Sequence, residues 1–388
     1  MNAPATAPQT VSFDHPLSID EVTQAITMFG ETNTILVEGT PGIGKSSILD
    51  ALEAKGYFRG YVDCANLSLG DAAMPVVDAE QMITKWAPNA LFGIHQGAKV
   101  ALMLDEFGKA VGEVRNMLLP LVNEHRLGSV KLPPGSIVFL TSNLRTDGLG
   151  DEIQPHVYNR LTRIRMGSPD KQKWQVWASK NNIDPILIAY VATYPEALAC
   201  YLDPGQEGNT RIFNPKRANI RSFASPRSLA RCSPYCTAYS NKSIGDGLFM
   251  SLIAGTVGEG VASEIFTLAS IGRNLPSVED IFANPLGCAD QVMGISGQNE
   301  TASVPDALSA AWIVIGQLIQ ALRVLCSKSP AMAVQHITAA VKFMDRIGHE
   351  EITYLFAHMV SKDPAIQLVG RGSPELRELS TRMSEIAG

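Results

Sequence analysis

A glycine-rich turn between a short apolar strand and a helix is the segment of this sequence best suited to bind phosphate. Residues 34–38 read as the strand, and residues 39–46, Gly-Thr-Pro-Gly-Ile-Gly-Lys-Ser, fit the pattern G-x-x-x-x-G-K-[ST]. Gly42 and Gly44 let the backbone curl so that successive N–H groups point inward, and the N-terminus of the following helix adds a partial positive charge. The segment therefore predicts a site for the phosphates of a nucleotide.

The polar side chains of this turn have complementary tasks toward a nucleoside triphosphate. Lys45 can reach the β- and γ-phosphates, and the Ser46 hydroxyl can ligate Mg²⁺. We predict the following helix over residues 45–55, ended by Gly56. Nucleotide contacts are expected from the whole run of residues: Gly39, Thr40, Pro41, Gly42, Ile43, Gly44, Lys45, Ser46 and Ser47.

Two carboxylates follow a second apolar strand. Residues 99–104 are almost continuously apolar and lead into Asp105-Glu106, which is typical of a buried parallel strand with an acidic C-terminal tip. Ligands of open α/β sheets bind at such tips. We predict that Asp105 holds Mg²⁺ with Ser46, and that Glu106 polarises the water that attacks the γ-phosphate. An isolated Asp-Glu pair would indicate only a solvated turn, but this pair follows a phosphate-binding loop.

A third apolar strand, residues 136–142, ends in a polar side chain. Asn143 follows it and could orient the attacking water or contact the γ-phosphate. Alone this is a weak signal, because asparagine often starts turns. Further on, residues 161–166 look like a strand with Ile164 and Met166 on its more buried face. Alternation puts Arg163 and Arg165 on the other face, where we expect them to point to solvent.

A basic segment lies in the second half of the chain. Residues 208–245 contain no Asp or Glu but seven cations, namely Arg211, Lys216, Arg217, Arg221, Arg227, Arg231 and Lys242. The segment could be a solvated loop, or it could contact ATP phosphates, a neighbouring subunit or an acidic partner. Within it, Ser225-Pro226-Arg227 reads as an N-cap, a proline at N1 and an arginine in the first turn. A cation at that position indicates a nearby anion.

The bulk composition limits the possible classes of protein. The chain has 388 residues, of which 45% are hydrophobic and 18% charged, with a net charge of −6. A mildly acidic chain argues against general nucleic-acid binding but does not exclude it. The sequence shows no unbroken apolar run of about 18 residues and no secretory n-region or h-region, so we expect a cytoplasmic protein without a membrane segment. All six cysteines are expected to be free thiols.

Composition and helix signals divide the chain into parts. Ser18 is a plausible N-cap for the first helix, and Pro169 marks the change from mixed to helical character. Residues 67–88 read as a loop with one short helix, residues 127–134 as a possible hairpin, and the Gly/Ser/Asn-rich residues 295–305 as a linker. The predicted division is a flexible tail 1–17, an α/β nucleotide-binding domain 18–168, an α-helical lid 169–290 and a helical C-terminal extension 291–388.

The motifs together resemble those of AAA+ ATPases, and within them the MoxR-like group. Residues 39–46 resemble the Walker A motif, residues 102–106 the Walker B motif, and Asn143 the sensor 1 position. Asn159-Arg160-Leu161 is similar to the Asn-Arg-Phe that carries the arginine finger, with Leu161 in place of Phe. Ser225-Pro226-Arg227-Ser228 resembles sensor 2. The group's pattern after the second strand departs here, where Asp105-Glu106 is followed by Phe-Gly-Lys.

This resemblance implies an α/β fold with a parallel sheet of order 5-1-4-3-2, a helical lid and a ring, usually a hexamer. In that ring Arg160 would reach the ATP of the next subunit, although Arg163 and Arg165 compete with it for this role. Glu106, Asn143, Arg160 and Arg227 are the expected catalytic residues, and ATP with Mg²⁺ are the expected ligands.

The resemblance predicts an ATPase that remodels or activates a protein partner, typically a von Willebrand A domain protein. The alternative is a nucleic-acid motor or loader that uses the basic residues 208–245. A GTPase is disfavoured, because Asn241-Lys242 is followed by Ser243-Ile244 and the guanine motif Asn-Lys-x-Asp is absent.

Overall fold

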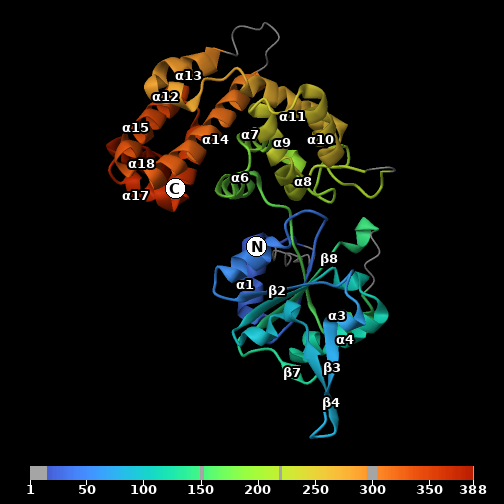
Figure 1. Ribbon diagram of the computed structural model, residues 1–388. Coiled ribbons are helices and arrows are strands. Elements are labelled where there is room, and N and C mark those ends of the chain that lie inside the picture. The colour runs from blue at the N-terminus through green and yellow to red at the C-terminus, as the bar shows by residue number, and fades with distance from the viewer. Residues whose placement is uncertain (1–14, 149–152, 218–220, 295–303, 388) are drawn as a thin grey trace, which may run out of the picture. The chain divides into compact units, whose positions relative to one another are not determined.

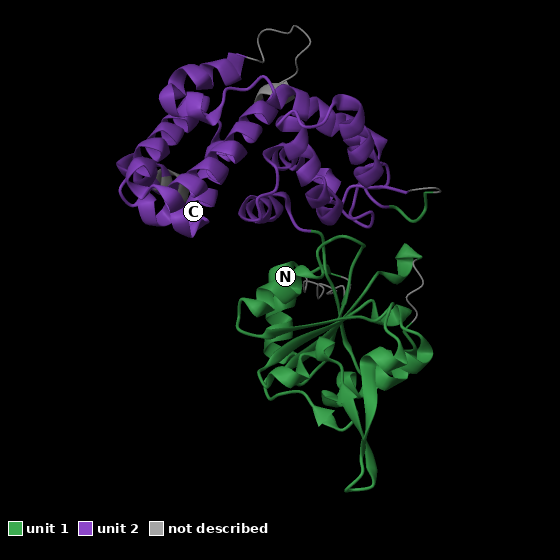
Figure 2. Cartoon of the chain, in the orientation of Figure 1, with its two compact units in different colours: residues 1–168, 214–218 green, residues 169–213, 219–388 purple. Residues whose placement is uncertain are grey.

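The computed structural model describes residues 15–148, 153–217, 221–294 and 304–387. The chain forms two compact units, shown in Figure 2. The first contains residues 1–168 and 214–218, and the second contains residues 169–213 and 219–388. The predicted tail 1–17 and linker 295–305 fall mostly outside the described residues. The predicted boundary at 290 lies inside the second unit, where it stays a prediction.

A five-stranded parallel sheet forms the centre of the first unit (Figure 1). Its strands are β1 (Ile35–Glu38), β2 (Phe58–Asp63), β5 (Val100–Asp105), β8 (Ile137–Ser142) and β9 (Thr162–Arg165). They lie in the order β2-β5-β8-β1-β9. Counted along the chain, this is the order 5-1-4-3-2, so the predicted fold class is confirmed.

The sheet is buried on both faces, as the continuous apolar runs of β5 and β8 require. On one face, Val37, Met103 and Phe139 pack with α1 (Ile19–Phe29) and α2 (Ser47–Glu53). On the other, Leu36 and Leu104 pack with α4 (Gly112–Glu124). Alternate residues of each strand thus belong to opposite cores, and all strand tips meet at one edge.

Two hairpins are inserted between the strands of this sheet. After the short α3 (Leu69–Ala72), β3 (Ala73–Asp78) pairs with β4 (Ile83–Pro88), and β6 (Arg126–Leu127) pairs with β7 (Val130–Lys131). The second hairpin was predicted, but the interpretation of residues 67–88 as mainly loop is wrong. The β3–β4 hairpin exposes most of its side chains and carries Pro75 within a strand, so the sequence lacks the alternation that marks a half-buried strand. The α5 helix (Pro155–Tyr158) precedes β9.

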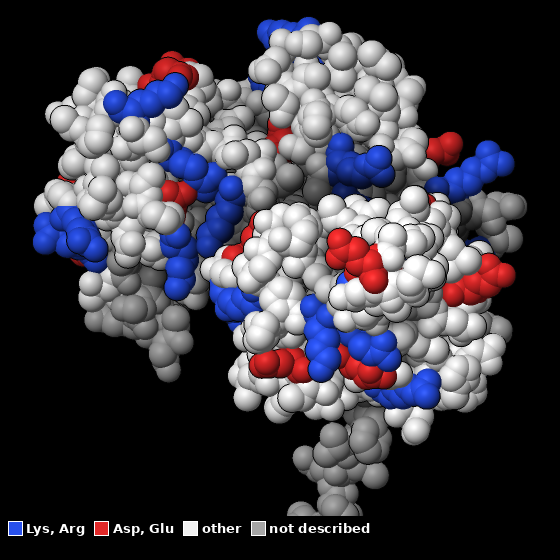
Figure 3. Space-filling view, turned by 60° about the horizontal axis from the view of Figure 1, so that its bottom comes forward, with Lys and Arg blue, Asp and Glu red and all other residues white. Residues whose placement is uncertain are grey.

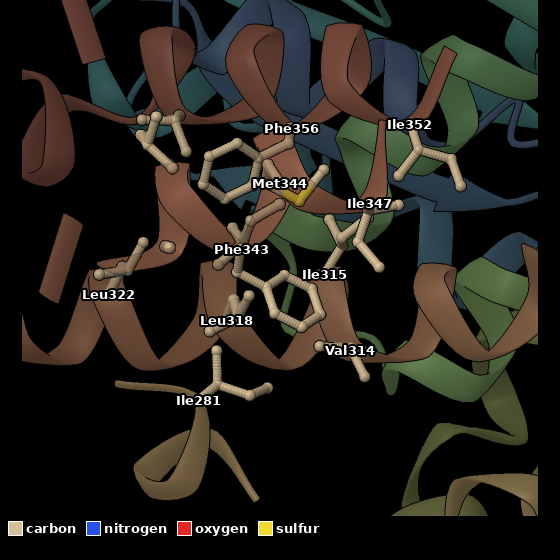
Figure 4. Close-up of a cluster of buried hydrophobic side chains, with 14 of the residues drawn as sticks. Ile281, Val314, Ile315, Leu318, Leu322, Phe343, Met344, Ile347, Ile352 and Phe356 are labelled. Carbon is tan, nitrogen blue, oxygen red and sulfur yellow. The ribbon is translucent and has the colours of Figure 1, made fainter. Parts of the chain in front are cut away.

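The second unit is helical and contains two hydrophobic cores. The first core joins α6 (Lys171–Lys180), α7 (Pro185–Thr193), α8 (Pro226–Arg231), α9 (Ser233–Ser240), α10 (Asp246–Val257) and α11 (Glu259–Gly272). The second core joins α12 (Val278–Ala283), α13 (Pro285–Gly294), α14 (Val304–Lys328), α15 (Pro330–Ile347), α16 (Glu350–Lys362), α17 (Pro364–Gly370) and α18 (Pro374–Ala387). Figure 4 shows its centre, where Leu318 of α14 lies among Phe343, Met344 and Phe356.

Helix α14 connects the two cores of this unit. A Cβ atom at Gly316 would lie 2.7 Å from Cβ of Pro185, so α7 approaches α14 at a position where only glycine fits. Residues 308–328 of α14 are long and apolar enough to span a membrane by mean hydropathy, but 61% of that window is buried inside the unit. It is the one such helix in the described part of the chain, and its burial is that of a core helix.

Candidate functional site

The phosphate-binding turn has the backbone that its glycines predict. Gly42 and Gly44 have φ of 82° and 102°, values that residues other than glycine rarely adopt. A Cβ at Gly39 would lie 2.4 Å from Cδ1 of Ile43 and 3.1 Å from the carbonyl oxygen of Met166. Helix α2 begins at Ser47, not at Lys45 as predicted. The reason is a tight turn, in which the Ser47 N–H donates to the Gly44 carbonyl three residues earlier.

The ammonium group of Lys45 lies inside this turn. The residue is only 8% exposed, and Nζ lies 2.6 Å from the Gly39 carbonyl oxygen and 3.4 Å from that of Thr40. Nζ also donates to Oδ1 of Asn143 at 3.1 Å. Asn143 follows β8 and is 5% exposed. The structure therefore brings together two predicted site residues that are 98 positions apart in the chain.

The carboxylate of Asp105 is held from the strands on both sides. Thr141 of β8 donates its hydroxyl to Oδ1, and Tyr61 of β2 donates to Oδ2 at 2.9 Å. Burial, together with the charge of Asp105, raises the pKa of Tyr61, which therefore stays protonated as a donor. Thr141 and Tyr61 were not predicted as site residues. Their positions could have indicated them, since both lie near the C-terminal ends of the strands that flank β5.

Glu106 has an unusual backbone conformation. Its φ of 50° and ψ of 42° are left-handed, and its N–H donates to Oγ1 of Thr141 at 3.3 Å. Its carboxylate accepts from Nζ of Lys109 at 2.7 Å. Lys109 ends the 3₁₀ helix Phe107–Lys109 and was not predicted as a site residue. Left-handed residues are sparse outside glycine and cluster at functional sites, which supports the assignment of Glu106.

These residues fit Mg-ATP by their chemistry. The donor set of Lys45 and the turn suits phosphate, while Ser46 and Asp105 supply hard oxygen ligands. Within the described ranges no group of three or more His, Cys, Asp or Glu residues could hold a metal ion. Proteins bind Mg²⁺ through one or two carboxylates together with substrate phosphates and water.

Arg160 and Arg163 have different surroundings. Arg160 lies between α5 and β9 and is exposed, and within the described residues its guanidinium has no ion pair or hydrogen bond. Arg163 is 56% exposed, but Nη2 lies 2.6 Å from Oε2 of Glu38. Arg163 is exposed, as expected, but it also pairs with Glu38, a carboxylate of β1 on the same face of the sheet, which was not predicted.

The sensor-like segment lies in the second unit. Ser225 caps α8 by accepting from the Ser228 N–H at 3.1 Å, Pro226 is the first helical residue, and Arg227 is exposed in the first turn. The predicted capping is confirmed, and a catalytic role for Arg227 stays a prediction.

The cations of residues 208–245 do not act as one group. Arg211 is bound to Glu264 at 2.5 Å and to Glu196 at 3.3 Å, and it lies over the Tyr194 ring. Arg211 therefore has an internal role in the helical unit. Lys216 and Arg217 belong to the first unit, whereas Arg211 belongs to the second. On the face shown in Figure 3, basic and acidic side chains are interspersed.

The six cysteines are free thiols, as predicted, and all six are buried. Burial raises the pKa of the Cys232 and Cys236 thiols, which disfavours the thiolates that a metal would need. These two side chains therefore belong to the helical core.

No protein family model and no curated protein matches this sequence. Among solved structures, a candidate ATPase from Cytophaga hutchinsonii is 14% identical, over 64% of this chain and 79% of its own, with a TM-score of 0.32. A RuvB mutant from Thermotoga maritima is 12% identical, over 76% and 89%, with a TM-score of 0.36. The S. cerevisiae Hsp104–ADP complex is 12% identical, over 96% and 48%, with a TM-score of 0.32. At this level of similarity these likenesses carry no argument, and the fold is described from the strand order and turn geometry of this chain alone.

Proposed function

We propose that this chain, whose first unit has the sheet order of an AAA+ P-loop NTPase, binds and hydrolyses Mg-ATP. The observation that carries the proposal is the contact of Lys45 with Asn143 inside a turn whose two inner glycines have positive φ. This contact joins the phosphate-binding turn to the tip of β8. Thr141 of the same strand joins that tip to Asp105 and Glu106.

The geometry supports a division of roles among these residues. Lys45 would exchange carbonyl and amide oxygens for phosphate oxygens, and Ser46 and Asp105 would hold Mg²⁺, which neutralises charge on the phosphates. Glu106 would accept a proton from the attacking water, and Asn143 would orient that water or the γ-phosphate. Because Glu106 adjoins Asp105 at the tip of one strand, base and metal ligand are held on the same rigid element.

The larger assembly and partner are also part of the proposal. The exposed Arg160 suits an arginine finger that reaches the ATP of a neighbouring subunit in a homo-oligomeric, hexameric ring. Arg227 would contact ATP from the helical unit. We propose a cytoplasmic ring that remodels or activates a protein partner, and the motif resemblance favours a von Willebrand A domain protein as that partner.

Nucleotide binding is tested with Lys45→Ala. Loss of the ammonium should abolish ATP binding measured by calorimetry, because Lys45 supplies the charge that meets the β- and γ-phosphates. Lys55→Ala is the matched control, since Lys55 follows the same helix and its Nζ donates to the Thr27 hydroxyl at 3.2 Å, away from the phosphate-binding turn. Unchanged ATP affinity in Lys45→Ala would remove the phosphate-site assignment.

The arginine finger is tested by mixing subunits. Arg160→Ala subunits and Glu106→Gln subunits should each be inactive alone but should bind ATP. In mixed rings, an intact Glu106 from one variant faces an intact Arg160 from the other, so partial ATPase recovery is expected. Mixed rings that form but stay inactive at every ratio would show that Arg160 does not act across the interface.

A further inference from the structure

The carboxylate that directly precedes the phosphate-binding turn is buried and ion-paired. Glu38 is the last residue of β1, and its side chain is 9% exposed. Arg163 donates to its Oε2 from Nη2 at 2.6 Å and from Nε at 3.2 Å. A buried carboxylate that loses its partner is strongly unfavourable. The pair therefore holds β9 against the end of β1 where the turn begins.

Strand register explains why these two side chains meet. In the parallel pair of β1 and β9, Arg163 lies opposite Leu36, and Glu38 is two residues further along. Residues two apart share a face of the sheet, so Arg163 has to reach only one step diagonally to the carboxylate. The contact depends on both strands and fixes their relative position.

The same arginine contacts the helix on the other side of Arg160. Cζ of Arg163 lies 5.1 Å from the ring centroid of Tyr158, the last residue of α5. Such a cation–π contact is attractive. A continuous chain of contacts thus runs from Glu38 through Arg163 to Tyr158. Arg160 lies between Tyr158 and Arg163 in the sequence, so these contacts hold both ends of the turn that carries Arg160.

The backbone of this turn is hydrogen-bonded throughout. The Arg160 N–H donates to the Val157 carbonyl at 3.0 Å, and the Leu161 N–H donates to that of Tyr158 at 3.1 Å. The Thr162 N–H donates to the Thr34 carbonyl at 3.0 Å, which attaches the turn to the start of β1. Because the Arg160 side chain is exposed, the direction in which it leaves the molecule is set by this turn.

We infer that Glu38 and Arg163 are positioning residues for Arg160, holding it in a fixed relation to the phosphate-binding turn of its own subunit. The inference rests on the proposed function, in which Arg160 acts on the ATP of the next subunit. It assigns Arg163 an internal role and removes it as a competitor for the finger. It also gives the phosphate-binding turn, through Glu38, a direct mechanical connection to the arginine presented to the neighbour.

Mixing experiments separate this role from an effect on the subunit's own nucleotide site. Arg163→Met and Glu38→Gln should each lower ATPase turnover by about 10- to 100-fold through misplacement of Arg160. ATP affinity by calorimetry should change less than about threefold. Each variant should regain activity when mixed with Glu106→Gln subunits, as Arg160→Ala does. Arg163→Lys should restore part of the turnover, because it keeps the charge.

The matched control is Arg59→Met. Arg59 also pairs with a carboxylate in the first unit, at 2.6 Å from Asp50, but this pair is exposed and distant in sequence from Arg160. Its turnover should equal that of the parent protein. The double variant Glu38→Gln/Arg163→Met removes both charges and leaves no lone buried carboxylate. It keeps the test valid if a single variant folds poorly, and it should also be rescued by mixing.

Hydrogen exchange gives a readout that needs no nucleotide. Amides in residues 158–162 should exchange faster in Arg163→Met and Glu38→Gln than in the parent, while those of β5 should not change.

Three results would overturn the inference. If Arg160→Ala is rescued by mixing but the Glu38 and Arg163 variants are not, the pair acts within its own subunit. If Arg163→Met is rescued but Glu38→Gln keeps full turnover, Arg163 is itself the finger. Failure of the Arg160→Ala rescue would remove both the finger and this inference, while loss of ATP binding in Lys45→Ala would still support the nucleotide site.

Discussion

Lys45 in the first unit and Arg323 in the second are both largely buried cations, but their charges are satisfied in different ways. In the first unit, Lys45 donates to carbonyl and amide oxygens at the edge of the sheet. In the second, Arg323 of α14 pairs with Asp363, the N-cap of α17, and also donates to the Ser179 carbonyl at 2.7 Å. Neutral oxygens around a cation can be exchanged for a phosphate, whereas an arginine that is paired with a carboxylate already has its counter-ion.

The comparison distinguishes a binding site from a structural clamp. Arg323 links three helices of the second unit, α6, α14 and α17, and its partner Asp363 is 7% exposed at the side chain. The polar groups around Lys45 lie at strand tips, which parallel sheets direct toward ligands. Burial of a charge alone therefore does not indicate a binding site. The chemical type of its partner and the place of the pair in the fold distinguish a binding site from a structural contact.

The largest effect is expected from breaking the clamp. Arg323→Met leaves the Asp363 carboxylate buried without its guanidinium and should lower the free energy of unfolding by about 3 kcal/mol. ATP affinity should not change, because Arg323 and its partners Asp363 and Ser179 are not among the residues proposed to contact the nucleotide. Chemical denaturation and calorimetry measure the two quantities. Arg346→Met, which removes an exposed pair with Asp290, is the control and should leave the free energy of unfolding nearly unchanged.

A change at the site should show the opposite pattern. Glu106→Gln keeps the size of the side chain but cannot accept a proton, so turnover should fall by about 10²-fold or more. ATP binding and the thermal unfolding midpoint should be unchanged. The exposed Glu113→Gln in the first turn of α4 provides a matched control with full activity. A Glu106→Gln protein that turns over at the parent rate would make Glu106 an ordinary surface carboxylate.

Lys109 sharpens the comparison because it forms an ion pair inside the site. Lys109→Met removes the ammonium that holds the Glu106 carboxylate, and we expect turnover to fall by about 10-fold while ATP affinity is kept. Lys109→Arg should recover much of the loss. A larger fall in stability than in turnover would instead make this pair a clamp like that of Arg323.

The smallest effect is expected at Asp184, a buried carboxylate of the helical unit. Burial raises its pKa in the folded state, and hydrogen bonds from the Ile186 N–H and the Thr237 hydroxyl only partly oppose this. The folded state therefore binds the proton more tightly than the unfolded state. Its contribution to stability is present below the unfolded pKa and is lost as pH rises through the folded pKa.

Asp184→Asn should remove this dependence. Compared with the parent, the variant should gain stability as pH rises from about 4, the unfolded pKa of an aspartate, to the raised folded pKa of Asp184. Urea unfolding from pH 4 to pH 7 measures the difference. A difference that is constant over this range would show that Asp184 does not titrate on folding.

The sequence by itself determined the local parts of this protein. The glycine-rich turn, the apolar strand before Asp105 and the caps at Ser18 and Ser225 depend on residues within a few positions of one another. Turn chemistry and hydrophobic period act over the same short range, so these features could be predicted. Motif order, through the family resemblance, supplied the sheet order.

Local signals failed where short-range preferences were overridden. Helix α2 starts two residues later than predicted, because the positive φ of Gly44 forces a tight turn first. The β3–β4 hairpin has few buried side chains to reveal its period.

Only the tertiary structure decided which side chains meet. Glu38 and Arg163 are 125 positions apart, and Lys45 and Asn143 are 98 apart. Whether such pairs form depends on the register of neighbouring parallel strands, since a shift of one residue would turn every side chain to the other face. No local pattern in the sequence encodes that register, because it follows from the packing of both sheet faces at once.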